Sequence, residues 1–160
     1  MRVLDVMMGT PYFCRSESNL GSATELMWTG NCGFLPVVGS EERVVGVVTD
    51  RDICIALGTR GRPSGEVAVA DVMSTTVRSC GPDDDVRVAL DAMRDGRVRR
   101  LPVITKNGAL VGVISIDDVL LRSAGTEAAS GKVSAQEVVD AFRAINTHPL
   151  PVAVAKSASA

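Results

Sequence analysis

An internal repeat constrains this sequence more than any other feature. Residues 46–52, with the sequence GVVTDRD, return as residues 112–118, GVISIDD, at an offset of 112 − 46 = 66 positions. The same offset aligns two further motifs without a gap, DVM at 5–7 with 71–73 and LPVV/LPVI at 35–38 with 101–104. Because internal self-similarity defines the architectural unit, the chain is interpreted as a tandem duplication.

The repeat predicts the domain organisation. The first copy is expected at 1–58 and the second at 67–122, joined by a linker at 59–66 that is rich in glycine, proline and arginine. A copy of this size buries too little surface to be stable alone, so the two copies are expected to pack into one cooperative unit. The remaining residues, 123–160, are expected to form a flexible segment, an amphipathic helix at about 134–145 and a disordered end.

Hydrophobic periodicity predicts an α+β fold in which each copy follows the order strand, helix, strand, strand, helix. The predicted strands are 11–14, 34–38, 44–48, 77–80, 101–104 and 110–114. The predicted helices begin after a cap at Ser18 or Asn19, at Asp50, at Asp84 and at Ile116. The side chains expected to face inward from these helices are Leu20, Ala23, Thr24, Met27, Trp28, Ile53, Ala56, Leu57, Val86, Ala89, Leu90 and Met93. In the tail, Ser134 and Glu137 form a capping box, and Val138, Val139, Phe142 and Ile145 are expected on one face that docks on its own domain or across a dimer.

Composition excludes several classes of protein. The net charge of -2 and the scarcity of aromatic residues disfavour nucleic-acid binding. A single histidine and four cysteines without CxxC spacing predict no metal site, and the cysteines are expected to be buried, reduced thiols. Cys14 and Cys80 are equivalent positions, so they could approach each other across an internal pseudo-twofold axis. Without a signal peptide or an apolar run of about 18 residues, we expect a cytoplasmic protein that does not enter a membrane.

The strand-to-helix junction of each copy contains the residues that could bind a ligand. Each copy places a hydroxyl, Thr49 or Ser115, where a strand meets a helix, and a carboxylate, Asp52 or Asp118, three residues later. A helix N-terminus favours a phosphate, and the carboxylate could accept hydrogen bonds from two ribose hydroxyls. The same spacing is also that of a capping box, which satisfies the helix end and binds nothing. Spacing alone leaves both interpretations open.

Four arginines could contribute to a phosphate site. Arg99 and Arg100 precede a buried strand and could present forked donors to a phosphate, or form only a solvated basic edge. Arg60 and Arg62 in the linker are weaker candidates. The first copy has Phe34 where the second has Arg100, so the copies differ in charge.

The motifs DVM, LPVV/LPVI and GVVTDRD/GVISIDD occur in the same order in both copies. In this arrangement the chain resembles a cystathionine β-synthase (CBS) domain pair over residues 1 to about 122. The narrower resemblance is to stand-alone pairs of the actinobacterial hypoxic response protein type. The resemblance implies two β-α-β-β-α units packed sheet to sheet with pseudo-twofold symmetry, often as a homodimer. It also implies two clefts that bind adenosine ligands such as AMP, ADP, ATP or S-adenosylmethionine as regulatory ligands, with no required cofactor.

The resemblance implies a role for each residue of this sequence that matches a binding position of the family. Thr49 and Ser115 would contact phosphate, Asp52 and Asp118 the ribose, and backbone near Val37 and Val103 would flank adenine together with Tyr12 and Arg78. Arg100 matches a phosphate contact. The cleft that uses Ser115, Asp118 and Arg100 is therefore expected to bind phosphate better.

The resulting prediction is a non-enzymatic regulatory module that senses an adenosine nucleotide and signals to an unknown protein partner, as in a stress response. The alternative is a ligand-free dimeric interaction scaffold in which the same residues only cap helices. A nucleotide hydrolase using Asp52 or Asp118 is disfavoured, because no nucleophile and base form a pair in the sequence.

Overall fold

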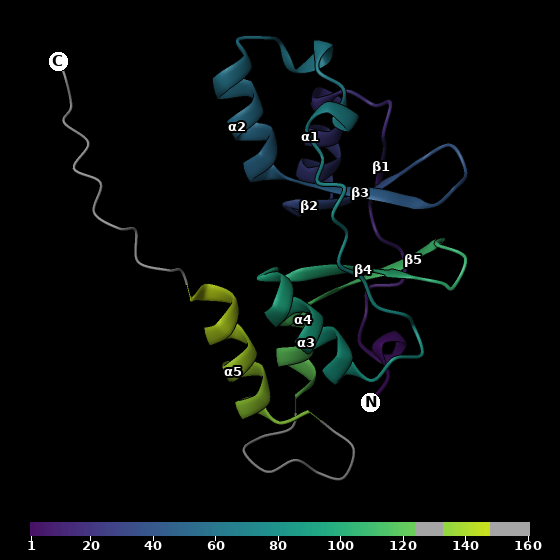
Figure 1. Ribbon diagram of the computed structural model, residues 1–160, viewed down its shortest axis with the longest axis vertical. Helices are drawn as coiled ribbons and strands as arrows, with labels where there is room; N and C mark the ends of the chain where they lie inside the picture. Colours follow the sequence, from purple (N-terminus) through teal and green to yellow (C-terminus); the bar gives the residue numbers. More distant parts are fainter. Residues whose placement is uncertain (124–132, 148–160) are drawn as a thin grey trace, which may run out of the picture.

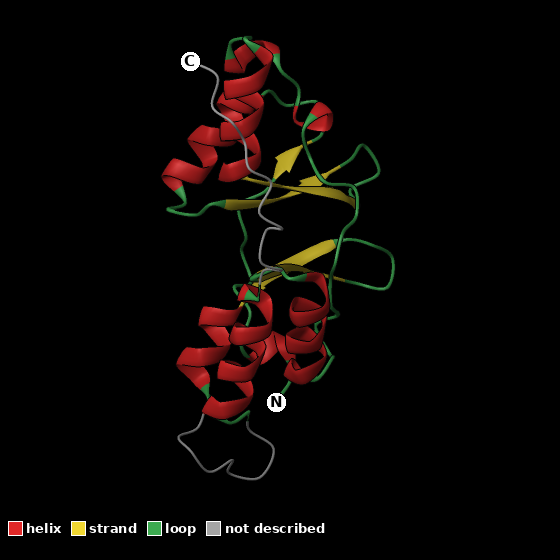
Figure 2. Cartoon of the chain, turned by 60° about the vertical axis from the view of Figure 1, so that its left-hand side comes forward, coloured by secondary structure: helices red, strands yellow, loops and turns green. Residues whose placement is uncertain are grey.

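The structure is a computed structural model, and it describes residues 1–123 and 133–147. The predicted flexible segment after Ser123 and the predicted disordered end lie outside these residues. In the described part, two small sheets face each other at the middle of the molecule, and helices cover their outer sides (Figure 1; Figure 2). The predicted α+β architecture is confirmed.

The first repeat follows the predicted order. It contains β1 (Cys14–Arg15), α1 (Leu20–Thr29), β2 (Phe34–Val38), β3 (Val44–Thr49) and α2 (Asp50–Arg60). The sheet has the order β1-β2-β3, with β1 parallel and β3 antiparallel to β2. The first strand begins later than the predicted 11–14. Helix α2 runs past the predicted repeat boundary to Arg60, where Gly61 adopts a left-handed φ of 61° and ends it.

The second repeat lacks a regular first strand. It contains α3 (Val86–Gly96), β4 (Arg100–Ile104), β5 (Leu110–Ser115) and α4 (Ile116–Arg122). The predicted strand at 77–80 is wrong, because only an isolated parallel bridge joins Cys80 to Val103. In the first repeat the amide of Ser16 extends the ladder to the carbonyl of Val38 at 3.2 Å. The equivalent residue in the second repeat is Pro82, which has no N–H to donate.

The two repeats exchange short arms. The arm at the start of the first repeat (residues 3–8) bridges β5 through Met8 and Val113, and the equivalent arm at the start of the second repeat (residues 69–74) bridges β3 through Ser74 and Val47. Accordingly, Val3 and Val6 belong to the hydrophobic core of the second repeat. In the same way Val67 and Val69 belong to the core of the first. Each core is therefore completed by residues from the start of the other repeat.

Most of the side chains predicted to face inward are buried, but Thr24 and Trp28 are exposed. Leu20, Ala23 and Met27 are buried in α1, and all four predicted positions of α3 are buried. Trp28, predicted to face inward, is 87% exposed. It lies one residue beyond Met27, about 100° further around the helix, and no described element covers it.

Helix α5 (Ala135–Asn146) docks on the second repeat beside α3 and α4 (Figure 1). The capping box of Ser134 and Glu137 is confirmed. Val138 and Ile145 are buried as predicted, whereas Val139 and Phe142 are exposed. Ala141 takes the inward position instead, because the buried stripe is narrower than predicted. None of the described helices is long and apolar enough to cross a membrane.

The cysteines occupy different environments. Cys14 lies in the core of the first repeat and Cys80 in that of the second. Burial raises the pKa of Cys14 to about 11 and that of Cys80 to about 12. Cys32 is half-buried, and Cys54 is exposed, contrary to the expectation that all four would be buried.

Candidate ligand-binding site

The two strand-to-helix junctions share one geometry. Asp52 Oδ2 accepts hydrogen bonds from the Thr49 amide at 2.9 Å and the Thr49 hydroxyl at 2.7 Å. Asp118 Oδ2 accepts the equivalent bonds from Ser115, at 2.8 Å from the amide and 2.5 Å from the hydroxyl. The predicted capping boxes are therefore present in both copies.

The capping box uses only half of each carboxylate. Within the described residues, Oδ1 of Asp52 and Oδ1 of Asp118 accept no hydrogen bond, while Oδ2 accepts two. A carboxylate has about four lone-pair sites over its two oxygens. Capping the helix and accepting a ligand's hydroxyl groups are thus compatible at the same aspartate.

A pocket of about 280 Å³ opens at the second junction. Four of the predicted site residues meet there: Tyr12, Arg100, Ser115 and Asp118. The pocket is also lined by residues that were not predicted as ligand contacts, namely Met8, Pro11, Gly30, Asn31, Cys32, Phe34, Val113 and Asp117. The exchanged arm explains this grouping, because the bridge between Met8 and Val113 carries Tyr12 from the first repeat to the junction of the second.

The other predicted residues lie elsewhere. Thr49 and Asp52 form the equivalent junction of the first repeat. Arg78 packs beside Gly96, where an added Cβ would lie 3.0 Å from Arg78 Cγ, just as Tyr12 packs beside Gly30. The side chains of Val37 and Val103 are fully buried in their cores, so only their backbone could flank a ligand.

The two adjacent arginines of β4 have different roles. Arg100 lines the pocket and makes no hydrogen bond or ion pair within the described residues, so its forked donors are available. Arg99 instead donates to Asn146 Oδ1 at 2.8 Å and lies over the Phe142 ring, 5.6 Å from its centroid. It therefore holds α5. Of the linker arginines, Arg60 donates to the Asp71 carbonyl at 2.7 Å and Arg62 to the Glu66 carbonyl.

The pocket offers polar groups of both signs. Among the described residues that line the pocket, Arg100 is the only cation, and Asp117 and Asp118 are the carboxylates. No group of three histidine, cysteine or acidic side chains among residues 1–123 and 133–147 could hold a metal ion. The chemistry on offer is recognition of a ligand that carries both an anionic group and neighbouring hydroxyls.

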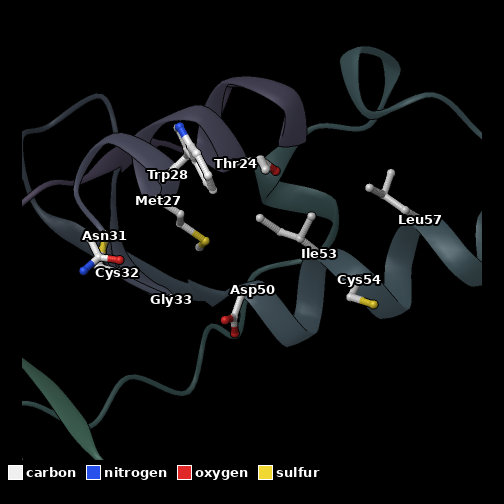
Figure 3. Close-up of a pocket in the computed structure, with 10 residues that line it drawn as sticks. All are labelled: Thr24, Met27, Trp28, Asn31, Cys32, Gly33, Asp50, Ile53, Cys54 and Leu57. Atoms are coloured by element: carbon white, nitrogen blue, oxygen red, sulfur yellow. The ribbon is translucent and has the colours of Figure 1, made fainter.

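A larger groove of about 550 Å³ lies between α1 and α2 (Figure 3). Met27, Trp28 and Ile53 form its apolar wall, and Asp50 lies at the start of α2. It contains none of the residues predicted for the ligand. Sequence periodicity missed this groove because it assigned Trp28 to the core.

Comparison with known proteins identifies the family. The CBS domain model matches residues 3–59 and 69–125. The uncharacterized protein MK0525 of Methanopyrus kandleri is 31% identical over 116 residues, which cover 72% of this chain and 57% of that protein. The chain thus spans little more than half the length of this relative.

Solved structures share the fold. Hypoxic Response Protein I with two coordinated zinc ions superposes with a TM-score of 0.71 at 24% identity, covering 78% of this chain and 100% of that chain. The CBS domain protein PAE2072 of Pyrobaculum aerophilum, complexed with AMP, gives a TM-score of 0.67 at 24% identity and covers 74% of this chain and 90% of that one. The chain belongs to the CBS domain family and contains a tandem CBS pair, as the sequence resemblance indicated.

Proposed function

We propose that this CBS pair is a regulatory module that binds an adenosine nucleotide in the pocket formed by Tyr12, Arg100, Ser115 and Asp118. The observation that carries the proposal is the free guanidinium of Arg100 beside a capped helix start whose aspartate has one unused oxygen. The arginine suits a phosphate and Asp118 Oδ1 suits the ribose hydroxyls. The AMP complex of PAE2072 supports the choice of ligand, since it has the same fold.

The two clefts are proposed to be unequal. Thr49 and Asp52 repeat the hydroxyl and the carboxylate, but Phe34 stands where the second repeat has Arg100. Arg78 is the cation on the arm that bridges to the first repeat, and we infer a weaker phosphate contact there. Val37 and Val103 would contribute only backbone to adenine.

The proposal also reaches beyond the pocket itself. The module acts as a homodimer in the cytoplasm and passes the occupancy of its pocket to a protein partner, in a stress response. It regulates rather than catalyses. A ligand can shift a dimer or partner surface only by its different affinity for two states of the module. Sedimentation with and without AMP tests the dimer.

The alternative is a scaffold without a ligand. The completed capping boxes favour it, because they give each hydroxyl and aspartate a structural role without any nucleotide. A scaffold would lose only helix stability when either aspartate is changed.

Calorimetric titration with AMP, adenosine, ATP, S-adenosylmethionine and GMP distinguishes the two. We expect the unchanged protein to bind AMP. Arg100→Ala should bind AMP about 10- to 100-fold more weakly, because a hydrogen bond to a charged group contributes about 1.5–3 kcal/mol. Adenosine has no phosphate, so its affinity should change little. Asp118→Ala should abolish both. Asp52→Ala is the matched control, because it removes the same cap at a cost of about 0.5–2 kcal/mol but leaves the second junction intact.

A panel in which no nucleotide produces heat or raises the unfolding temperature at millimolar concentration would reject the sensor and favour the scaffold. Equal loss of AMP binding in Asp52→Ala and Asp118→Ala would reject the assignment of the better site to the second junction.

A further inference from the structure

Two adjacent residues, Arg99 and Arg100, connect the candidate pocket to helix α5. The side chain of Arg100 lines the pocket. The side chain of Arg99 holds the end of α5, where it donates to Asn146 Oδ1 at 2.8 Å and lies over the Phe142 ring. One dipeptide thus contacts both the place where a ligand would lie and a helix outside it. A change at either place can reach the other across a single peptide bond.

The backbone of this dipeptide is also tied to the start of helix α4. The carbonyl oxygen of Arg99 accepts the amide hydrogen of Ile116, the first residue of α4, with the nitrogen and oxygen 3.0 Å apart. Arg100 is paired with Ser115 in the ladder between β4 and β5. Ser115 and Asp118, the predicted phosphate and ribose contacts, lie at this same junction. A ligand that orders the junction therefore also orders the backbone from which Arg99 reaches α5.

The first repeat has the backbone connection without the side chains. At the 66-residue offset the dipeptide corresponds to Gly33 (99 − 66) and Phe34 (100 − 66). The carbonyl oxygen of Gly33 accepts the amide hydrogen of Asp50 at 3.2 Å, as that of Arg99 accepts the amide hydrogen of Ile116. Glycine has no side chain with which to hold a helix. The connection from a junction to an outer helix is therefore a feature of the second repeat.

Helix α5 is suited to be an element with two states, docked and open. It has 12 residues, and an isolated helix of about this length is marginal in water, so α5 depends on the surface that it covers. It buries Val138, Ala141 and Ile145 against α3 and α4, beside which it lies in Figure 1. A terminal helix held by few buried side chains opens at a lower free energy than the core beneath it.

We propose that docking of α5 is coupled to occupancy of the pocket through Arg99 and Arg100, so that a bound nucleotide and a docked α5 stabilise each other. The coupling is positive because ligand and helix both hold the dipeptide in one conformation, and whichever binds second meets a smaller loss of conformational freedom. Occupancy of the pocket is thereby passed to the surface of the second repeat. The inference deepens the proposed function and rests on it only for the identity of the ligand.

Hydrogen exchange of the α5 amides, followed by mass spectrometry on the full chain, measures how often α5 opens. We expect saturating AMP to slow this exchange at least about fivefold, the lower end of typical coupling between two sites. The double variant Phe142→Ala, Asn146→Ala removes both contacts of Arg99 but keeps its charge, and neither side chain is buried. Its α5 should exchange faster without AMP, and AMP should leave that exchange nearly unchanged.

Glu137→Gln is the matched control, because it loosens the same helix at its other end. Glu137 Oε1 accepts a hydrogen bond from Arg87 Nε at 2.6 Å, and Arg87 is not among the residues that line the pocket. This variant should also exchange faster without AMP, but AMP should slow its exchange by the same factor as in the unchanged protein. Equal effects of AMP on the control and on the double variant would overturn the route through Arg99.

A second comparison needs no nucleotide. Asp118→Ala removes the cap at the start of α4, and Asp52→Ala removes the same cap from α2, where Gly33 has no side chain to hold an outer helix. Asp118→Ala should accelerate exchange in α5, and by a smaller factor once the double variant has removed the contacts of Arg99. Asp52→Ala should leave exchange in α5 unchanged.

The two comparisons separate failure of the coupling from failure of the nucleotide proposal. If calorimetry detects no nucleotide binding but Asp118→Ala accelerates exchange in α5 through the contacts of Arg99, the ligand assignment fails and the coupling stands. The coupling is overturned if AMP binds without slowing exchange in α5. It is equally overturned if Asp118→Ala and Asp52→Ala have the same effect on α5.

Discussion

At the scale of single residues, two glycines allow the repeats to approach each other. A Cβ on Gly112 would lie 2.6 Å from Met7 Sδ and 2.8 Å from the Met8 carbonyl oxygen. A Cβ on Gly46 would lie 2.6 Å from Met73 Sδ and 3.0 Å from the Ser74 carbonyl oxygen. These glycines are therefore needed where each exchanged arm crosses the opposite hairpin.

Gly112→Ala is expected to lower the free energy of unfolding by about 1–3 kcal/mol, because the backbone of the arm cannot yield as a flexible side chain could. Gly58→Ala is the control, since it has open space within helix α2 and should raise that free energy by about 0.5–1 kcal/mol. Urea unfolding measures both. Equal stability of the two variants would contradict the close approach.

The cysteines lead to a second prediction at this scale. Because burial raises the pKa of Cys14 to about 11 and that of Cys80 to about 12, almost no thiolate is present there at pH 8. Iodoacetamide should modify the exposed Cys54 first and reach Cys14 and Cys80 only in denaturant, as followed by mass spectrometry. Rapid labelling of Cys14, or a disulfide between Cys14 and Cys80 in the native protein, would refute this.

At the scale of elements, α5 is held mainly by apolar packing and secured by polar contacts at its two ends. The hydrogen bond from Arg87, and then that from the Ser134 amide, lower the pKa of Glu137 to about 2 from the ordinary 4.5. A carboxylate with a depressed pKa stabilises the folded state above its ordinary pKa, and this contribution is lost as the pH falls through the folded value.

Glu137→Gln keeps a capping oxygen but removes the charge that faces Arg87. We expect the unfolding temperature at pH 7 to fall by about 1–4 °C, the effect of an exposed ion pair on a domain of this size. The difference from the unmodified chain should shrink between pH 4.5 and pH 2 and vanish below. Glu25→Gln, which removes a carboxylate with no ion pair among the described residues, is the control. A difference that persists at pH 2 would assign the loss to packing.

At the scale of the whole molecule, the exchange of arms makes each core depend on both repeats. Val3 lies at the start of the first repeat but is fully buried in the core of the second, and the equivalent Val69, at the start of the second repeat, is fully buried in the core of the first. The repeats are therefore expected to unfold together in one transition.

Val3→Ala and Val69→Ala form a reciprocal pair for testing this coupling. Each should lower the free energy of unfolding by about 1–3 kcal/mol through the cavity it leaves. Amide hydrogen exchange should accelerate most in α3 for Val3→Ala and most in α1 for Val69→Ala. If each variant instead accelerates exchange most in the repeat to which the changed residue belongs in the chain, the arms are not exchanged in solution.

The sequence by itself determined the repeat, its offset, the capping boxes of both junctions and the CBS family. These features follow from local periodicity and from short motifs whose hydrogen bonds close within four residues, so they can be read without knowing the fold. Most of the buried positions of the helices were predictable for the same reason. Trp28 was assigned wrongly because periodicity defines a face of a helix but not how wide a stripe its neighbours cover.

Only the tertiary structure decided which parts of the two repeats meet. The bridges from Met8 to Val113 and from Ser74 to Val47 join residues far apart in the chain, and they bring Tyr12 to Ser115 and Asp118. The same is true of the division of roles between Arg99, which holds α5, and Arg100, which lines the pocket. The local sequence of each repeat is compatible with packing against its own arm or against the arm of the other repeat. Only the packing of the two hydrophobic cores selects the exchanged arrangement.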